Sequence, residues 1–332
     1  MCGLTASAAK PPGAGPASAS GVSIPVALVH CAAYNPELLT TSIQACWKSI
    51  GRFFRPGDVV LVKPNLVSSR QAHLSCTHPQ LVRSVCTLLL DHGVRVQVGD
   101  SPAFGTAGQV ARVAGLTEAL RDLKLPIRDL NRPVQRHLDC GIQVGISRHA
   151  LEADLLLNVP KLKAHSQLLL TAASKNLFGC VSGIRKALAH MRHGQNDDLA
   201  MLILDLQAHL PPTTSLLDAV TAMHVSGPAS GQPCSLGLLA ASDNAVALDT
   251  VIYTALGLRP DQAPLWREAR RKSLPGHHPD QIATALLSSS ALDFSAFQLP
   301  DRLNPVSFHP CQLVKSTCRR AWLKMRAMMN EN

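Results

Sequence analysis

The sequence is poor in aromatic residues and contains no long apolar run. Phe, Tyr and Trp make up 4% of the 332 residues, and they do not alternate with basic residues as a base-stacking surface requires, which argues against nucleic-acid binding. A transmembrane helix needs ~20 consecutive apolar residues, and no stretch of the chain approaches that length. We therefore predict a protein with neither a nucleic-acid partner nor a membrane span.

Several sequence signals are also missing. Residues 1–21 are mainly Ala, Gly, Pro and Ser and lack the apolar core of a secretory signal, so we predict a flexible tail and a cytoplasmic location. The ten cysteines include no Cys-x-x-Cys pair, which favours reduced thiols over a zinc or iron–sulfur site. The dinucleotide-binding, phosphate-loop, nucleophile-elbow and zinc-protease motifs are absent. The sequence itself identifies no cofactor and no metal.

The composition is that of a globular protein with an excess of positive charge. Hydrophobic residues make up 46% and charged residues 16%, which excludes wholesale disorder. The length allows one large domain or two ordinary ones. Lys and Arg number 32 against 22 Asp and Glu, giving a net charge of +10. This charge favours acidic partners.

Short apolar runs alternate with helical patterns between residues 22 and 258, which is typical of an α/β domain with a mostly parallel sheet flanked by helices. The runs are apolar almost throughout, as expected of strands buried on both faces. The predicted strands are Val22–Cys31, Asp58–Lys63, Val94–Val98, Ala153–Asn158, Leu216–Met223 and Leu236–Ala241. Helices are predicted over Pro79–His92, Leu199–Leu210 and Asn244–Leu256.

Beyond residue 258 the sequence is punctuated by proline and rich in arginine, and we predict a helical C-terminal appendage over residues 259–332. Its expected helices are Asp261–Lys272, Pro279–Ser288 and Gln312–Met329. The last of these combines an apolar stripe with a basic surface. It is interpreted either as a helix docked on its own domain or as a helix resting on anionic lipid or a partner.

Three predicted strands run into polar clusters. Lys63 and Asn65 follow the first, Asp100 the second, and Lys161, Lys163 and His165 the third. The carboxyl ends of parallel strands share one edge of a sheet, where ligands of α/β proteins bind. The segment 161–193 contains Lys175, Lys186 and His190 as well but no Asp or Glu. We therefore predict an anion site, with a solvated basic loop as the alternative.

Two further patterns concern charged and capping residues. Thr77-His78-Pro79 places Pro at the first position of a predicted helix, whose free N–H groups either bind an anion or are simply capped. Asp205, Asp218 and Asp249 lie in apolar stretches, where an unpaired carboxylate is costly. We expect them to pair with the lysines of the polar clusters, with a divalent metal as the alternative.

The ordered set of motifs resembles the DUF362 family. It comprises Val62-Lys63-Pro64-Asn65-Leu66, Thr77-His78-Pro79, Val98-Gly99-Asp100-Ser101-Pro102, Asn158-Val159-Pro160-Lys161-Leu162-Lys163-Ala164-His165 and Lys175-Asn176-Leu177-Phe178-Gly179, followed by Gly183-Ile184-Arg185-Lys186 with His190. The resemblance covers about residues 58–257. It implies a domain of unknown function that is often joined to a ferredoxin-like module with two iron–sulfur clusters.

This chain departs from the family pattern in two places. Only Cys311 and Cys318 lie in its C-terminal region, too few for such clusters. Ala164 stands where Thr is expected, so that position has no hydroxyl to offer. The region from Lys175 to His190 is also similar to nickel-dependent lactate racemase-like proteins, which implies Lys and His residues acting on a 2-hydroxy acid or a pyridine-derived cofactor.

Two functional hypotheses follow. In the first, the chain is an enzyme that binds a small anionic ligand, a carboxylate or a phosphate. Lysines would bind the anion, asparagines would orient it, and histidines or the aspartate would transfer protons. The binding residues would be Lys63, Asn65, Lys161, Lys163, Lys175, Asn176 and Lys186, and the catalytic residues His78, Asp100, His165 and His190. In the second, it is an accessory protein that docks an acidic ferredoxin-like partner.

Overall fold

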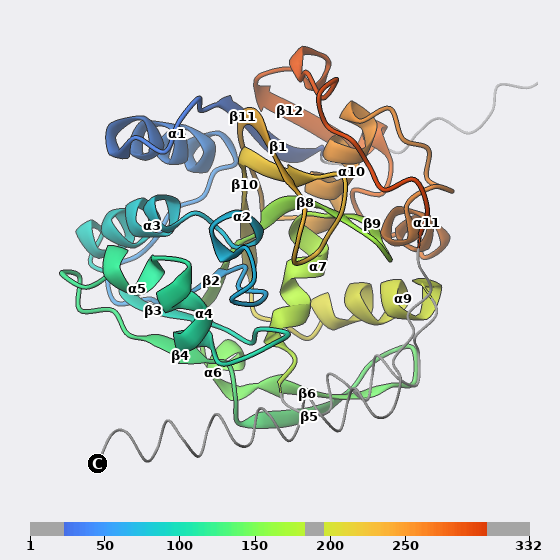
Figure 1. Cartoon of the computed structure of the whole chain (residues 1–332). Helices are drawn as coiled ribbons and strands as arrows, with labels where there is room; N and C mark the ends of the chain where they lie inside the picture. Colours follow the sequence, from blue (N-terminus) through green and yellow to red (C-terminus); the bar gives the residue numbers. More distant parts are fainter. Residues whose placement is uncertain (1–22, 183–195, 304–332) are drawn as a thin grey trace, which may run out of the picture.

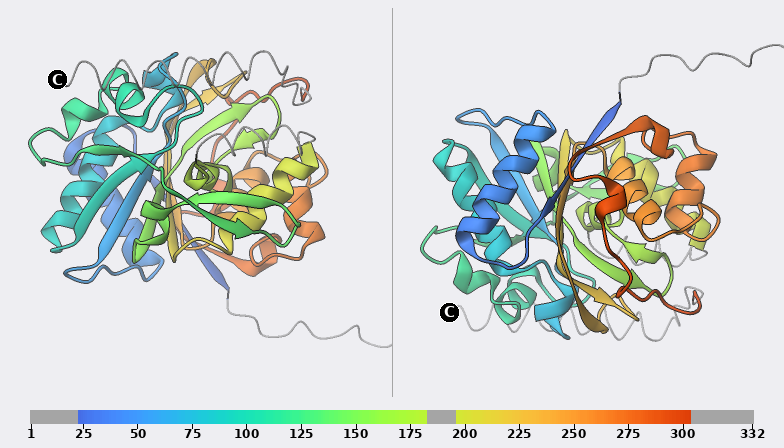
Figure 2. Two further views of the ribbon diagram at one scale, coloured as in Figure 1. Left: turned by 90° about the horizontal axis from the view of Figure 1, so that it is seen from below. Right: turned by 90° about the horizontal axis from the view of Figure 1, so that it is seen from above.

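The structure is a computed structural model that describes residues 23–182 and 196–303. A large, mostly parallel sheet runs through the centre of the molecule, and helices cover both of its faces (Figure 1). Viewed from above, the sheet stands nearly edge-on between the two helical layers (Figure 2). The predicted α/β class is therefore confirmed.

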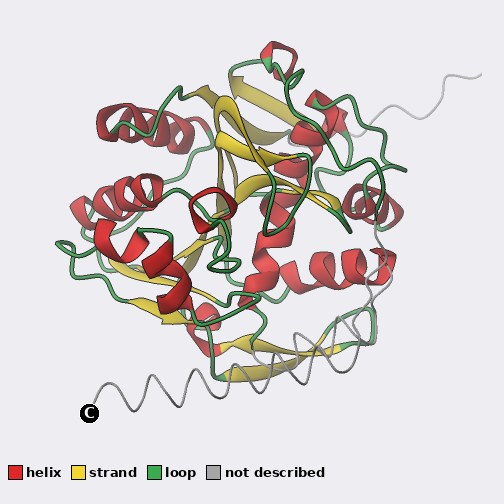
Figure 3. Ribbon diagram, viewed as in Figure 1, coloured by secondary structure: helices red, strands yellow, loops and turns green. Residues whose placement is uncertain are grey.

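Eight strands form the main path of this sheet, which Figure 3 shows in yellow. Their order is β12-β1-β11-β10-β7-β2-β3-β4. Every neighbouring pair is parallel except the two pairs that involve β11. The strands are β1 (Ile24–His30), β2 (Val59–Pro64), β3 (Arg95–Asp100), β4 (Ile127–Asp129), β7 (Leu155–Val159), β10 (Thr213–His224), β11 (Gln232–Ser242) and β12 (Ile282–Leu286). The carboxyl ends of all but β11 consequently lie at one edge, which we term the carboxyl edge.

Two more strands extend the sheet beyond this edge. After Pro160 the chain continues from β7 into β8 (Lys161–His165), which pairs with the second half of β10 through Asp218 and Met223. The strand β9 (Leu169–Thr171) then folds back along β8. The polar cluster predicted to follow a strand is thus itself a strand, held inside the protein by β10. A separate hairpin, β5 (Pro133–His137) and β6 (Gln143–Ser147), lies below α9 in Figure 1.

The helices divide between the two faces according to the alternation of strand side chains. Val60 and Val62 point into one apolar cluster and Leu61 into the other, as expected when both faces are buried. The first cluster is covered by α1 (Pro36–Ser49), α3 (Pro79–Asp91), α4 (Ala107–Val113) and α5 (Leu116–Ala119). The second is covered by α7 (Ala173–Leu177), α9 (Asn196–Gln207), α10 (Ala245–Ala255) and α11 (Pro264–Arg271). Single-turn helices α2 (Ala72–Ser75) and α6 (Arg148–Leu151) and three 3₁₀ turns, Phe178–Cys180, Pro279–Gln281 and Ser289–Ala291, complete the described elements.

The structure corrects part of the C-terminal prediction. The helix expected over Asp261–Lys272 is present as α11, but Pro279–Ser288 is not helical. A 3₁₀ turn over Pro279–Gln281 leads into β12, which pairs in parallel with β1. The sequence of a short apolar segment does not by itself distinguish helix from strand. Here the segment forms a strand because it pairs with the edge of β1. Residues 259–303 therefore contribute directly to the main sheet. The predicted tail 1–21 and helix Gln312–Met329 lie outside the described residues.

Candidate functional site

A cavity of about 390 Å³ opens at the carboxyl edge. Its walls come from the β1–α1 loop, from α2 and the start of α3, and from β8, β10 and β11, which are distant in sequence. The lining residues are Tyr34, Gln71, His73, Leu74, His78, Lys161, Thr221, Gly231 and Pro233. None of these residues is acidic. We call this space the outer cavity.

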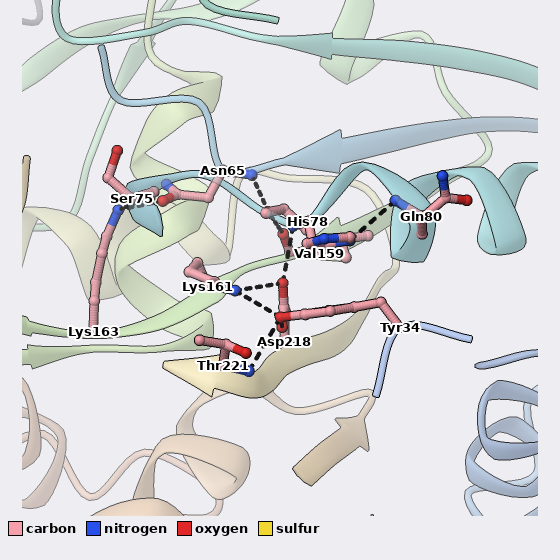
Figure 4. Close-up of polar contacts among 11 residues, drawn as sticks. Tyr34, Asn65, Ser75, His78, Gln80, Val159, Lys161, Lys163, Asp218 and Thr221 are labelled. Carbon is pink, nitrogen blue, oxygen red and sulfur yellow. Dashed lines mark hydrogen bonds and ion pairs between the residues drawn. The ribbon is translucent and has the colours of Figure 1, made fainter. Parts of the chain in front are cut away.

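The base of the outer cavity is built on a buried ion pair. Lys161 Nζ lies 3.0 Å from Asp218 Oδ2, and both side chains are almost fully excluded from solvent. Lys161 also donates to the Tyr34 hydroxyl at 2.9 Å, and that hydroxyl donates to Asp218 Oδ1 at 2.7 Å. Figure 4 shows this triangle of side chains. Two of the three ammonium N–H groups are therefore engaged, and the third remains for the cavity.

The Asp218 carboxylate also accepts a hydrogen bond from the start of α3. The backbone N–H of His78 donates to Asp218 Oδ2 at 2.9 Å, so the free end of this helix is satisfied from within the chain. The helix start predicted at Thr77-His78-Pro79 is confirmed, with His78 as the N-cap and Pro79 following it. Its Nδ1 accepts the N–H of Gln80 at 3.3 Å, which places the proton of the neutral imidazole on Nε2.

The His78 ring stacks on Tyr34, with ring centroids 3.5 Å apart. Burial lowers the pKa of His78 from its ordinary value, and nearby Lys161 adds to this, while Asp218 opposes it. His78 is consequently neutral at pH 7 and presents an N–H donor. Burial and the adjacent Asp218 charge raise the pKa of Tyr34, so the phenol stays protonated.

A second group of charged side chains, which we call the inner cluster, lies at the ends of β2 and β3. Lys63 Nζ is 2.7 Å from Asp100 Oδ1, with both side chains buried. The other carboxylate oxygen accepts the N–H of Leu66 at 2.8 Å. Gly179 packs against this ion pair so closely that a Cβ there would overlap both partners. Glycine is therefore required where η1 (Phe178–Cys180) crosses the pair.

Lys163 extends the inner cluster toward α2. Its ammonium donates to Asn65 Oδ1 and, at 2.8 Å, to the carbonyl of Ser75. Burial lowers the pKa of Lys163 well below its ordinary value, and Lys175 is the next cause. Asn65 Nδ2 donates to Asn176 at 2.7 Å, and Asn176 donates in turn to Asn158 at 2.8 Å. These amides tie β2, α7 and β7 together at the carboxyl edge.

Lys175 differs from the other three lysines. It is only partly buried, and it forms neither a hydrogen bond nor an ion pair in the part of the chain that is described. Burial lowers its pKa to about 8, with the neighbouring Lys63 as the second cause and Asp100 opposing. The two clusters together contain four lysines and two carboxylates, so they carry excess positive charge whenever the lysines are protonated.

The predicted site residues therefore have different surroundings. Lys63, Asn65, Asp100, Lys163, Lys175 and Asn176 gather in the inner cluster, whereas Lys161 and His78 line the outer cavity. His165 is buried, and its Nδ1 accepts the N–H groups of Gln167 and Leu168, which fixes a turn. Lys186 and His190 lie outside the described residues.

The three buried aspartates only partly follow the prediction. Asp218 pairs with Lys161 as expected. Asp205 instead pairs with Lys272, the residue that follows α11. The helix α11 packs beside α9, so a residue outside the predicted basic clusters satisfies Asp205. Asp249 has no lysine partner and accepts the N–H groups of Ala173 and Ser174 at 2.7 and 3.1 Å. Residues 23–182 and 196–303 hold no group of three or more His, Cys, Asp or Glu suited to a metal ion.

Sequence reasoning missed all the other polar side chains of the outer cavity, which are those of Tyr34, Gln71, His73 and Thr221. Tyr34 lies three residues after the first predicted strand, so a search for polar residues beyond strand ends could have found it. Gln71 and His73 lie on a single-turn helix with no periodicity to detect. Thr221 reaches the cavity from the middle of β10, where the register shifts between Ala219 and Thr221, a feature that only the folded sheet reveals.

Comparison with known proteins establishes the family. The family model described as "Domain of unknown function (DUF362)" matches residues 60–254, more than half of the chain. The chain belongs to the DUF362 family. A thylakoid-associated protein of Synechocystis sp. is 33% identical to this DUF362 protein over 305 residues, covering 90% of this chain and 95% of the relative. The expectation drawn from the ordered motifs is thus confirmed.

Two solved structures show weaker similarity to the DUF362 protein. The lactate racemase apoprotein from Thermoanaerobacterium thermosaccharolyticum matches with a TM-score of 0.44 and 14% identity, over 71% of this chain and 57% of that one. A protein from Thermotoga maritima matches with a TM-score of 0.38 and 10% identity, over 63% and 56% of the two chains. Across the described residues of the DUF362 protein, no helix combines the length and apolarity needed to cross a bilayer.

Proposed function

We propose that this DUF362 protein is an enzyme that binds a small anionic substrate, a carboxylate or a phosphate, in the outer cavity. The observation that carries the proposal is the chemistry of the cavity wall. Its polar side chains come from lysine, histidine, glutamine, threonine and tyrosine, and no carboxylate lines it. A wall of this kind provides hydrogen-bond donors and positive charge without an opposing negative group.

Lys161 and His78 form the base of the proposed substrate site. Lys161 has one N–H left after its bonds to Tyr34 and Asp218, and His78 directs its Nε2–H away from the helix that it caps. Both are fixed before a ligand arrives, by Asp218 and by the Tyr34 stack. Such preorganised donors would stabilise negative charge that develops on a substrate during proton transfer.

Gln71 and His73 form the exposed part of the wall. Gln71 uses its carbonyl oxygen to accept the N–H of Gly231 at 3.0 Å, which leaves its amide N–H groups as donors. The inner cluster lies at the same carboxyl edge, where Lys163 has only neutral hydrogen-bond partners and Lys175 has no ion-pair partner among the described residues. A bound anion would relieve the mutual repulsion of these lysines.

The test is calorimetric titration of the full chain with inorganic phosphate, acetate, lactate and succinate at low ionic strength. We expect at least one of these anions to bind. His78→Asn retains a capping oxygen for Gln80 but removes the Nε2 donor, and it should weaken binding about 10-fold, the equivalent of ~1.4 kcal/mol. Lys161→Ala with Lys175→Ala should abolish binding. Lys48→Met removes an exposed charge on α1 and should leave binding unchanged.

Unchanged affinity in the double alanine variant, or the absence of binding by every anion, would refute the proposal. Native mass spectrometry with metal analysis on protein purified without oxygen then identifies any retained ligand and the chemistry that it implies. The accessory-protein hypothesis has a distinct signature. It predicts no small-molecule binding but a salt-sensitive association with an acidic ferredoxin-like protein.

A further inference from the structure

A small buried chamber lies where α7, α9, α10 and α11 meet. Its volume is about 10 Å³, close to that of one solvent-sized sphere. Four oxygen-bearing side chains line it, those of Ser174, Asp249, Thr250 and Tyr253, and the rest of the wall is apolar or aromatic. All four residues are at least 97% buried.

Three of these oxygens have unused bonding capacity. The hydroxyl groups of Thr250 and Tyr253 are excluded from solvent and form no hydrogen bond, and the Ser174 hydroxyl has no partner besides Asp249. A buried polar group without a partner is costly, and two such groups around one chamber are unusual. The Tyr253 ring stacks on Trp266, with ring centroids 5.4 Å apart, so the hydroxyl is held at the chamber by packing.

Asp249 is exceptional among the buried acids of the described chain. Asp100, Asp205, Asp218 and Glu268 are each paired with a lysine or an arginine. Asp249 is 3% exposed, and its partners are the N–H groups of Ala173 and Ser174 and the Ser174 side chain, none of which is charged. A buried charge normally needs a counter-charge, and the chamber is where one fits.

We propose that this chamber binds a single dehydrated alkali cation, with Na⁺ preferred to K⁺. Its ligands would be a carboxylate oxygen of Asp249 and the hydroxyl oxygens of Ser174, Thr250 and Tyr253. One carboxylate matches one positive charge, whereas a divalent ion would leave excess charge in an apolar surrounding. A chamber of single-ion size also excludes Mg²⁺, which retains several of its waters. Oxygen ligands suit a hard cation.

The ion would fasten α10 to α7. Ser174 is the ligand from α7, and the next two residues are Lys175 and Asn176 of the inner cluster. Cation binding would thus fix the segment that presents those two side chains. This proposal does not depend on the substrate of the outer cavity, because its observations concern other residues.

The experiment compares thermal unfolding of the full chain at pH 8 in NaCl, KCl and N-methylglucamine chloride at equal ionic strength. We expect Na⁺ to raise Tm in a saturable manner, by roughly 5 °C when its concentration is about 100 times Kd. Asp249→Asn should abolish the difference between Na⁺ and N-methylglucamine, and Tyr253→Phe should reduce it. Thr254→Val removes a hydroxyl from the exposed side of the same helix and should respond like the parent chain.

Equal Tm values in Na⁺ and N-methylglucamine would overturn the proposal and assign the chamber to a water molecule or a protonated Asp249. So would a Na⁺ effect of the same size in Tyr253→Phe and Thr254→Val. Because Asp249→Asn can fail to fold, ²³Na NMR of the parent chain supplies a second measurement. Excess line broadening that K⁺ reverses only at higher concentration supports the site, and its absence refutes it.

Discussion

Individual lysines in this protein are buried to a degree that requires specific partners. Lys63, Lys161 and Lys163 are at most 2% exposed, and removing an ammonium from water costs several kcal/mol. Lys63 and Lys161 offset this cost by pairing with a carboxylate. Lys163 offsets it by donating to an amide oxygen and a backbone carbonyl oxygen. The lysines at the carboxyl edge are therefore part of the structural framework as well as candidates for ligand binding.

The Lys161–Asp218 pair gives the first prediction. Lys161→Gln or Asp218→Asn alone should lower the free energy of unfolding by about 3–5 kcal/mol, because each leaves the other charge buried without its counter-ion. The double variant should cost clearly less than the sum of the two. Urea denaturation of all four proteins measures this coupling. The exposed pair Arg259–Asp261 is the matched control, with an expected coupling below about 1 kcal/mol. Additive effects at Lys161 and Asp218 would contradict the prediction.

Lys175 gives a second prediction, concerning pH. Its pKa of about 8 means that half of its amine is neutral near pH 8, whereas an exposed lysine reaches this point near pH 10.4. Peptide mass spectrometry after brief acetylation across pH 7–10 should show Lys175 reacting with a midpoint near 8. Lys48 serves as the exposed control on the same chain. A profile of Lys175 that follows Lys48 would contradict the assignment.

The same shift has a definite effect on stability. Between pH 8 and 10.5 the unfolded chain binds more protons at Lys175 than the folded chain does. The contribution of this residue to the free energy of unfolding therefore rises with pH across that window. Below pH 8 both states are protonated, so the cost of burying the charged ammonium is fully present there.

Much of the site was predictable residue by residue, since lysines and amides that end parallel strands must share an edge. Lys63 and Asp100 meet for that reason, and Lys161 lies at the same edge. The particular partner of each lysine was not predictable, because the sequence does not show that Asp218 on β10 lies opposite Lys161 on β8 or that Gly179 covers Lys63. Asp249 shows the same limit, since its lack of a cationic partner is visible only after folding.

At the scale of elements, the turn that follows α7 presses directly on the inner cluster. Gly179 lies in η1, and a Cβ at this position would overlap Asp100 Oδ1 and Lys63 Nζ. The backbone there and the Lys63–Asp100 pair form one packed unit. Any side chain at residue 179 must displace one of the two.

The third prediction therefore concerns this glycine. Gly179→Ala should lower the free energy of unfolding by about 1–3 kcal/mol, through overpacking against a buried ion pair. Gly108 in α4 is the matched control, since no atom lies within 4 Å of its added Cβ. Gly108→Ala should leave stability equal or raise it by up to about 1 kcal/mol. Equal effects of the two substitutions in urea denaturation would refute the role of Gly179.

Elements with a strong periodic pattern were predicted well, and those defined by their neighbours were not. The helix α3 and its proline start follow from local sequence. The lysines of β8 indicate a polar cluster after a strand rather than a strand, because lysines are unusual in a buried strand, and only pairing with β10 explains them. β12 was interpreted as a helix for the related reason that its partner, β1, is far away in sequence.

For the whole molecule, the two apolar clusters share a single sheet. Trp47 on α1 belongs to one cluster and Trp266 on α11 to the other. The main sheet includes β12 from the C-terminal region and β1 from the N-terminal region. Loss of either cluster would expose one face of the same strands, so we expect residues 23–303 to unfold as one unit.

The fourth prediction tests this with two single-tryptophan proteins. Trp322→Phe combined with Trp266→Phe leaves Trp47 as the reporter, and Trp322→Phe combined with Trp47→Phe leaves Trp266. Relative to circular dichroism of the same sample, each fluorescence transition in urea should have the same midpoint. A midpoint for Trp266 that departs from the circular dichroism transition would instead support an independent C-terminal unit beginning at residue 259.

The position of β1 has a consequence for synthesis on the ribosome. This strand is translated before the other strands of the described residues, but its two partners are β11, which begins at Gln232, and β12, which begins at Ile282. The backbone N–H and C=O groups of this apolar strand therefore lack their hydrogen-bond partners while most of the chain is translated. Release of the nascent chain before residue 286 would leave the edge of β1 that pairs with β12 without a partner. Such truncated products should depend on chaperones and aggregate without them.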